Sequence, residues 1–533
     1  MGQKLMVQIV RVIPLANSTL KNAAIATLGN YIEFFITLLV SIVIARGLGP
    51  ELYGQYAFII WLSGFFIAFM TVGVSTGAIK YLAEATGRER TDQYYGLHVH
   101  FRKIQLAIIS LSLMIFMLST YYFDFRVADS RWLALFLALS VGLKAVHMYR
   151  VSALKGLEQF WRVSLIAFIV SPLNLLVVFV AFIYQADIVT FFWIYILSSS
   201  FYHLVSYFLL RDKIPKVNTA QFDKALDGSS SGALEKTLVK NINHHILLIT
   251  CSSTLGFVVM RQSELYFLNL FASSAEVAFF NVAFVLASAV VTLVPGALDA
   301  ILLPLVARSL AKSTNDAAVR LQAVFRFALH LSIIVAVPLV YFAEDLIVLM
   351  YGEEYLAAAF PFQAILIVLS FGVFASTCRA FLLSDNRQGF MFKLTSVATF
   401  FTLLLDYLLV KNFGLFGAVV AFVSTTFFVS FIQIFMTVRW AGLFIDTPCF
   451  LRSSVAALIA FLMMHILNVD VQPMVNMIFG SVLFVSFYLC IALFFKVFKV
   501  DDINILLTIK NKVMGDRLSS FDSLLRRNAA NDN

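Results

Sequence analysis

Long apolar stretches, separated by short polar segments, follow one another along almost the whole chain. About fourteen of them approach or exceed the roughly 20 residues that a helix needs to cross a bilayer. Lipid offers no hydrogen-bond partner to an open backbone, so such stretches must be helical. We predict membrane-spanning helices at 23–45, 56–79, 104–122, 132–149, 163–184, 189–210, 245–270, 279–304, 325–343, 359–383, 394–410, 416–438, 453–468 and 475–498.

The connecting segments predict how these helices are grouped. After six stretches comes a long, basic segment that contains the flexible run DGSSSG, which is typical of a linker between two halves. We predict an N-terminal interfacial segment (1–22), a first six-helix bundle (23–210), a cytoplasmic linker loop (211–240), a second six-helix bundle (241–438), two additional transmembrane helices (453–498) and a cytoplasmic tail (499–533).

The composition narrows the class of protein. Hydrophobic residues make up 61% of the chain and charged residues 13%, whereas average soluble proteins are about 45–50% apolar and about 25% charged. A soluble protein must cover its surface with polar residues, so it cannot bury so large a fraction of apolar side chains. The sequence therefore predicts an all-α polytopic membrane protein and excludes a soluble enzyme or a disordered chain.

The distribution of charge predicts the orientation in the membrane. With the N-terminus inside, 34 of the 39 Lys and Arg residues fall on inside segments, which is the bias expected of cytoplasmic loops. With an even number of spans, both termini are cytoplasmic. The net charge of +9 is explained by this bias, and we expect no nucleic-acid partner.

Motifs for catalysis and for cofactor binding do not occur in the sequence. It contains no nucleotide-binding glycine motif, no HExxH and no GxSxG, and its four cysteines lie far apart. We therefore expect a protein that is not an enzyme and that needs no metal or cofactor.

Five predicted helices carry polar residues at spacings that place them on one helical face. Several such faces together can surround a water-filled cavity. The alternative is that Ser and Thr pack helices together and bond back to their own carbonyls. The faces are Asn30, Glu33, Thr37 and Ser41; Tyr195, Ser199, Tyr202 and Ser206; Ser288, Thr292, Pro295 and Asp299; Thr395, Thr399, Thr402 and Asp406; and Thr426, Ser430, Gln433 and Thr437.

Ionised groups inside predicted spans are the strongest candidates for function, because a charge at bilayer depth must meet water or a partner. Arg261 and Glu264 are three residues apart, so they can pair on one helical face; the alternative is a structural pair that fixes the seventh helix. Asp299 follows a Pro-Gly pair, and Lys144 lies near the inner end of the fourth span. We predict that Arg261, Glu264, Lys144 and Asp299 bind substrate and that Glu33 couples transport to an ion.

Six short motifs resemble the polysaccharide-biosynthesis flippases of the multidrug/oligosaccharidyl-lipid/polysaccharide exporter superfamily. The resemblance extends over most of residues 20–440 and implies two six-helix bundles around a central cleft, often with two added helices, that work by alternating access. The motifs are IARGLGPELYGQYAFI (44–59), ALKGLEQFWRVS (153–164), MRQSELYFLNLFASSAEVAFFNVA (260–283), LPLVARSLAK (303–312), LMYGEEYLAAAFPFQAIL (349–366) and FGLFGAVVAF (413–422).

The resemblance also implies a cargo, an undecaprenyl-diphosphate-linked oligosaccharide that crosses the bacterial cytoplasmic (inner) membrane for O-antigen, capsule or exopolysaccharide synthesis. Membrane lipid, a polysaccharide polymerase and export machinery are the partners it implies. Two positions depart from the family, Ala278 and Phe280, where a Gly and a Tyr are frequent.

Two alternatives stay open. Glu33 resembles the acidic residue of cation-coupled members, which keeps an H⁺- or Na⁺-coupled multidrug antiporter of the same fold as the second hypothesis. A membrane glycan polymerase or ligase is less favoured, because the longest predicted outside loop, 344–358, has only about 15 residues.

Overall fold

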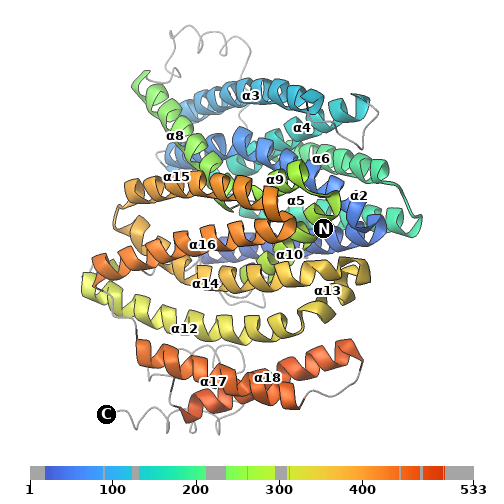
Figure 1. The fold of residues 1–533 in the computed structure, drawn as a ribbon. Coiled ribbons are helices and arrows are strands. Elements are labelled where there is room, and N and C mark those ends of the chain that lie inside the picture. Colours follow the sequence, from blue (N-terminus) through green and yellow to red (C-terminus); the bar gives the residue numbers. More distant parts are fainter. Residues whose placement is uncertain are drawn as a thin grey trace. The chain divides into compact units, whose positions relative to one another are not determined.

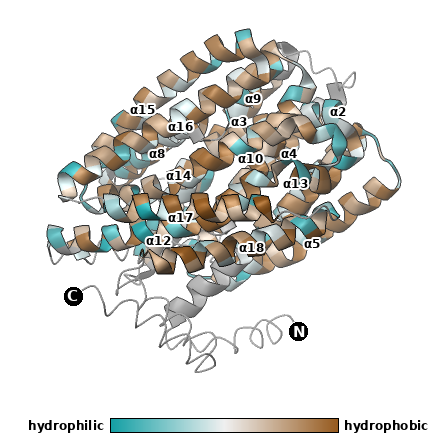
Figure 2. Cartoon of the chain, turned by 60° about the horizontal axis from the view of Figure 1, so that its bottom comes forward, coloured by the Kyte–Doolittle hydropathy of each residue, from teal (hydrophilic) through white to brown (hydrophobic). Residues whose placement is uncertain are grey.

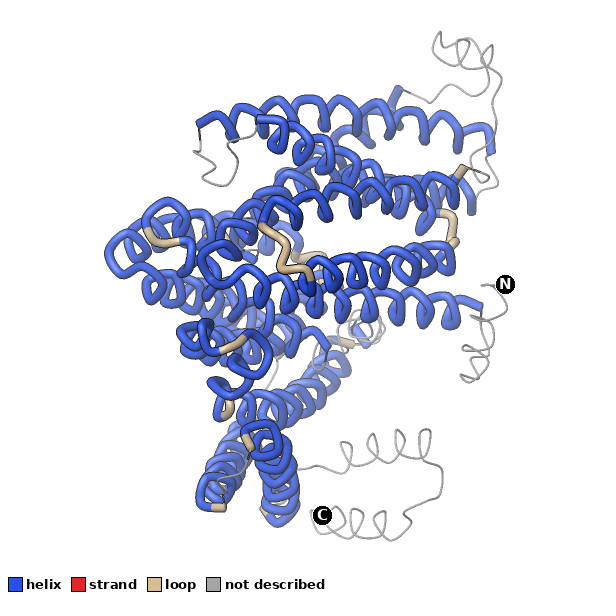
Figure 3. Tube along the Cα trace, turned by 90° about the vertical axis from the view of Figure 1, so that its right-hand side faces the viewer, coloured by secondary structure: helices blue, strands red, loops and turns tan. Residues whose placement is uncertain are grey.

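Every regular element in the described part of the chain is helical. The computed structural model describes residues 18–87, 91–122, 131–211, 236–260, 262–293, 306, 309–310, 313–442, 446–467, 472–495 and 497. Within these ranges there are helices and the turns between them, and no strand (Figure 3).

The helices have the length and composition of membrane spans. Eleven stretches within the described ranges are long and apolar enough to cross a membrane. Two of them, Tyr31–Ala85 and Gln388–Ala441, each hold a break that divides them into two helices. In addition, α4 (Arg131–Gly156) lies at the predicted fourth span. Apolar residues cover most of the helical surface in Figure 2. The chain is therefore a multi-pass helical membrane protein, which confirms the predicted fold class.

Glycines form the sharp breaks inside two of the helical elements, α2 and α16. In α2 (Ser18–Gly87), Gly49 has a φ of 71° and a ψ of 170°, and Pro50 follows it. In α16 (Lys411–Ala441), Gly414 has a φ of 52°. A residue with a Cβ is strained at such φ values, and Pro lacks the N–H that would continue the helix. The breaks lie at the turns predicted between the first and second spans and between the eleventh and twelfth.

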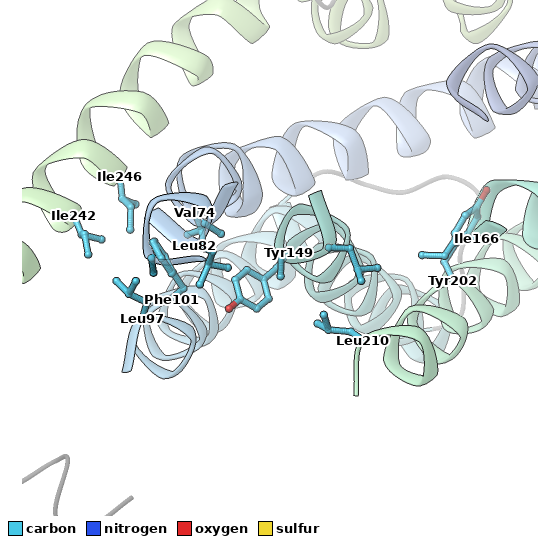
Figure 4. Close-up of a cluster of buried hydrophobic side chains, with 14 of the residues drawn as sticks. Val74, Leu82, Leu97, Phe101, Tyr149, Ile166, Tyr202, Leu210, Ile242 and Ile246 are labelled. Carbon is cyan, nitrogen blue, oxygen red and sulfur yellow. The ribbon is translucent and has the colours of Figure 1, made fainter. Parts of the chain in front are cut away.

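The contacts divide the chain into two compact units, of which the first is Met1–Ala278. A core of buried side chains joins Val74 and Leu82 of α2 to Phe101 of α3 and to Ile242 and Ile246 of α8 (Figure 4). Besides α2 and α4, this unit holds α3 (Thr91–Tyr122), α5 (Phe160–Ile183), α6 (Ile188–Leu210), α8 (Lys236–Met260) and α9 (Glu264–Phe271) (Figure 1).

This division falls later in the chain than the predicted linker. The first helix after that linker, α8, packs on α2 and α3, so it belongs to the first unit. Most of the linker itself, residues 212–235, lies outside the described residues, and the predicted bundle limits stay a prediction.

The prediction of one continuous helix over 245–270 is wrong. The first of two helices, α8, ends at Met260, and the second, α9, begins at Glu264. Between them Gln262 has a φ of 66°, which interrupts the helical hydrogen-bond ladder. The assumption of one continuous helix, on which the predicted pairing of Arg261 with Glu264 depends, is therefore not met, and Arg261 itself lies outside the described residues.

The second unit is Phe279–Asn533. Its helix α10 (Ser274–Leu293) begins just before this limit. After it come α12 (Thr314–Tyr341), α13 (Ala343–Tyr351), the 3₁₀ helix η2 (Glu353–Ala358), α14 (Ala359–Ser384), α15 (Gln388–Leu405), the π-helical turn η3 (Asp406–Val410), α16, α17 (Thr447–Ile466) and α18 (Pro473–Phe494).

Two His–Tyr pairs fasten the last two helices to the second unit. His330 Nδ1 of α12 lies 2.7 Å from Tyr488 Oη of α18, and both side chains are buried. Tyr341 Oη lies 3.0 Å from His465 Nδ1 of α17. Because a buried polar pair is costly to break, the His330–Tyr488 pair holds α18 against α12. The exposed Tyr341–His465 pair adds a contact between α12 and α17.

The turn between η3 and α16 depends on a close backbone approach at Gly417. A Cβ at this position would overlap the carbonyl of Leu409. We expect Gly417→Ala to lower the free energy of unfolding by about 1–3 kcal/mol, as overpacked sites do. At Gly372 of α14 a Cβ meets nothing within 4 Å, so Gly372→Ala should be neutral or stabilising by about 0.5–1 kcal/mol. Thermal unfolding of both variants in detergent measures this difference, and equal midpoints would contradict it.

Candidate functional site

The predicted polar faces of the first and sixth spans meet inside the first unit. Tyr202 of α6 donates from Oη to Glu33 Oε1 of α2 over 3.4 Å. Tyr202 is buried, together with its stripe neighbours Ser199 and Ser206. On α2, Thr37 donates back to the carbonyl of Glu33 over 2.8 Å. Two of the five predicted polar faces are therefore in contact.

Tyr202 collects polar groups from three further positions. Ser171 Oγ of α5 lies 2.9 Å from Tyr202 Oη. Lys144 Nζ of α4 lies 3.5 Å from the centroid of the Tyr202 ring, and the ring of His147 lies 5.0 Å from it, centroid to centroid. We call Glu33, Lys144, His147, Ser171 and Tyr202 the Tyr202 cluster. It is built by the three consecutive helices α4, α5 and α6 together with α2, which lies about 100 residues earlier at Glu33.

The cluster holds one positive and one negative charge in reach of each other. The ammonium of Lys144 lies close enough to the Glu33 carboxylate for the two charges to interact. An unpaired charge at bilayer depth costs from about 3 to more than 10 kcal/mol, and a desolvated cation over an aromatic ring gains about 2 kcal/mol. Both side chains are half-buried. Their charges are therefore balanced inside the unit.

Local sequence explains why α4 and α6 present these groups. Lys144 and His147 are three residues apart, so they share one face of α4. Beside them, Gln105 Nε2 of α3 donates to the carbonyl of Ala145 over 3.0 Å, which fixes this turn of α4. The start of α6 is capped by Asp187, whose carboxylate accepts from the backbone N–H of Thr190 over 3.0 Å. The hydrogen bonds from Thr190 also hold the pKa of the Asp187 carboxyl below its usual value.

Of the three other predicted site residues, the structure describes only Glu264, and it is not among the contacts of the Tyr202 cluster. Glu264 is buried, 1% exposed, at the first residue of α9, where the helix N-terminus favours a carboxylate. Arg261 and Asp299 lie outside the described residues. Of the five predicted site residues, the structure thus brings together Glu33 and Lys144, and their roles stay predictions.

The polar face of α15 behaves differently. Thr395, Thr399 and Thr402 each donate to the carbonyl four residues earlier, which is the packing alternative for these hydroxyls. Asp406 is fully buried in the π-helical turn η3. The buried members of the α16 face are Ser430, Gln433 and Thr437. A water-filled cleft lined by all five faces stays a prediction.

Sequence reasoning missed Ser171 and the role of Tyr202 as the centre of the cluster. Ser171 precedes Pro172 in an otherwise apolar run, and Pro leaves a helical carbonyl without its usual donor. A polar residue beside a helical Pro is thus a signal that could have found it. The contact of Lys144 with the Tyr202 ring depends on how α4 packs on α6, which no local pattern reveals.

The described residues contain no group of three or more His, Cys, Asp or Glu side chains that could hold a metal ion. What the Tyr202 cluster offers instead is an ammonium, a carboxylate and two hydroxyls. An ammonium binds phosphate as a point charge, and a carboxylate exchanges a proton or a small cation.

The model of one protein family, described as polysaccharide biosynthesis protein, matches residues 19–310 of the chain. No curated protein matches the sequence.

Several solved structures share the fold. The lipid II flippase MurJ in an inward closed conformation aligns with a TM-score of 0.66 at 14% identity, over 88% of this chain and 98% of that one. An inward-facing multidrug resistance MATE family transporter of the MOP superfamily aligns with a TM-score of 0.63 at 16% identity, over 77% and 94%. A MOP superfamily transporter from Pyrococcus furiosus aligns with a TM-score of 0.57 at 16% identity, over 79% and 96%. At these identities the likeness shows the fold alone.

Proposed function

The chain belongs to the family of polysaccharide biosynthesis proteins, and on that premise we propose that it flips an undecaprenyl-diphosphate-linked oligosaccharide across the bacterial cytoplasmic membrane by alternating access. A diphosphate and several sugars cannot cross hydrocarbon unaided, because each polar group that loses its water costs several kcal/mol. The lipid tail stays in the bilayer while the headgroup follows a polar path. The family and the shared fold of a lipid II flippase support this cargo class.

The single observation that carries the proposal is that Tyr202 contacts both charged groups: Lys144 lies over its ring and its hydroxyl donates to Glu33, which brings the two charges near enough to interact. The Lys144 ammonium has its charge balanced by one carboxylate, and an incoming diphosphate competes for the same ammonium. Loaded and unloaded states then differ in which anion Lys144 meets. That difference is what a substrate needs in order to shift a protein between two conformations.

Glu33 supplies the second half of this exchange. A proton or a sodium ion on the Glu33 carboxylate removes its charge and frees Lys144 for the phosphate. Binding of the cation and of the headgroup then favour each other, and linkage makes the effect reciprocal. Tyr202 donates to Glu33 and lies under Lys144. It thereby keeps the carboxylate and the ammonium close together, so that a change of charge on one acts directly on the other.

The remaining predicted residues extend the proposal beyond the Tyr202 cluster. We propose that Arg261, Glu264 and Asp299 contact the headgroup elsewhere on its path. We also propose that both termini are cytoplasmic, that the glycan is an O-antigen, capsule or exopolysaccharide unit, and that a polymerase and export machinery receive it.

Purified protein in liposomes tests the proposal directly. A fluorescent undecaprenyl-diphosphate-linked oligosaccharide is quenched from outside, and its rate of exchange between leaflets is measured. We expect Lys144→Ala to slow exchange about tenfold or more, because a lost charge-assisted hydrogen bond is worth about 1.5–3 kcal/mol.

The control variant is Lys411→Ala, which removes a lysine that also lies over a tyrosine ring, Tyr407, but is exposed. It should keep the wild-type rate. Wild-type rates in both variants would remove Lys144 from the mechanism, and no exchange by the wild-type protein would refute the proposed cargo.

A multidrug antiporter is the second candidate, and the observation that favours it is the half-buried Glu33 carboxylate, which accepts from Tyr202 and is placed for cation exchange. Glu33→Gln in cells separates the two functions. If the chain is a flippase coupled through Glu33, the variant loses surface glycan and leaves drug sensitivity unchanged. If drug resistance falls while surface glycan stays intact, the antiporter is correct.

A further inference from the structure

Two arginines from neighbouring helices lie near each other in the first unit, and neither forms an ion pair with a carboxylate of the described residues. Arg102 of α3 and Arg150 of α4 lie close enough for their like charges to interact. In the described part of the chain, no carboxylate forms an ion pair with Arg102, Arg150 or Arg211. Like charges held together at a protein surface attract an anion that binds between them.

The contacts of Arg150 direct its guanidinium to the end of α6. One nitrogen, Nη1, donates to the carbonyl of His203 over 2.9 Å, and the guanidinium carbon lies 5.1 Å from the centroid of the Tyr207 ring. Arg211, just after α6, stands over the Phe208 ring at 5.2 Å. An arginine has five N–H donors, so Arg150 keeps most of its donors for a further partner.

The rings beneath these arginines are turned outward. Tyr207 is 47% exposed and Phe208 51% exposed. Their neighbours Leu204 on α6 and Met148 on α4 are 47% and 40% exposed. Exposed aliphatic and aromatic groups on a membrane helix contact lipid chains, and aromatic rings with cations beside them are typical of the membrane–water interface.

We propose that Arg102, Arg150 and Arg211, with the Tyr207 and Phe208 rings, form a binding surface for the phosphate headgroup of an anionic phospholipid. We call it the arginine surface. It combines cations that lack a carboxylate with apolar groups one helical turn away, and a phospholipid presents a phosphate and acyl chains in that arrangement. A free phosphate has no acyl chains, so it would make no contact with the neighbouring apolar side chains.

The position fits a bulk lipid better than the transported one. The arginine surface lies on the outward side of α4 and α6, where Tyr207 and Leu204 are exposed. On α6 the Tyr202 cluster uses the buried face, whereas on α4 Arg150 lies one helical turn after His147 of the cluster, so the two sites adjoin there. By the predicted topology the arginine surface lies at the cytoplasmic leaflet, whose anionic lipids attract Lys and Arg near the membrane surface.

Native mass spectrometry of the full chain in neutral detergent tests this proposal without any transport step. Phosphatidylglycerol and phosphatidylcholine with the same acyl chains are the probes. We expect wild-type protein to prefer phosphatidylglycerol and the variant Arg102→Gln/Arg150→Gln to lose affinity for it by about fivefold for each arginine removed. Affinity for phosphatidylcholine should stay unchanged.

Two further variants keep the result interpretable. Arg211→Gln changes an exposed residue at the end of α6, so it should fold and still lose about fivefold. Arg452→Gln, an exposed arginine of α17 in the second unit, should bind as the wild type does. Unchanged phosphatidylglycerol binding by the arginine-surface variants would overturn the proposal. Binding of undecaprenyl diphosphate, and not of phosphatidylglycerol, through these arginines would also overturn the proposal. The surface would then bind the transported lipid and not a bulk phospholipid.

Discussion

The first unit must provide partners for one ammonium, that of Lys144, which lies among its membrane helices. Lys144 meets the Tyr202 ring at 3.5 Å and the charge of Glu33. Without such partners its cost, from about 3 to more than 10 kcal/mol, would rival the stability of a typical domain. The packing of α2, α4, α5 and α6 around Tyr202 therefore provides polar contacts that lipid does not.

The same requirement makes the cluster suited to transport. A charge that is balanced by one movable partner can be balanced by another, and each partner stabilises a different state. Contacts of another kind fix the helices within each unit: the buried side chains shared by α2, α3 and α8 in the first unit, and the His–Tyr pairs between α12 and the last two helices in the second. The residues that hold the helices together are thus different from the residues of the Tyr202 cluster that carry the exchangeable charge.

Much of the fold could be predicted from the sequence because the bilayer imposes a local rule. Length and apolar composition located the spans, and the Gly49–Pro50 pair marked a turn that the backbone confirms. The break at Gln262 was missed because the short polar run 261–264 lies between two apolar stretches and was interpreted as charged groups within one helix. The site was only half predictable: Glu33 and Lys144 stand out as ionised groups, whereas their meeting at Tyr202 depends on tertiary packing.

The central claim is that the charges of Glu33 and Lys144 depend on each other within the first unit. A double-mutant cycle with Glu33→Gln, Lys144→Gln and the double variant measures this dependence through the free energy of unfolding in detergent. The claim predicts a coupling energy of about 1–3 kcal/mol, with the double variant less damaged than the sum of the single ones. Effects that add to within about 0.5 kcal/mol would contradict it.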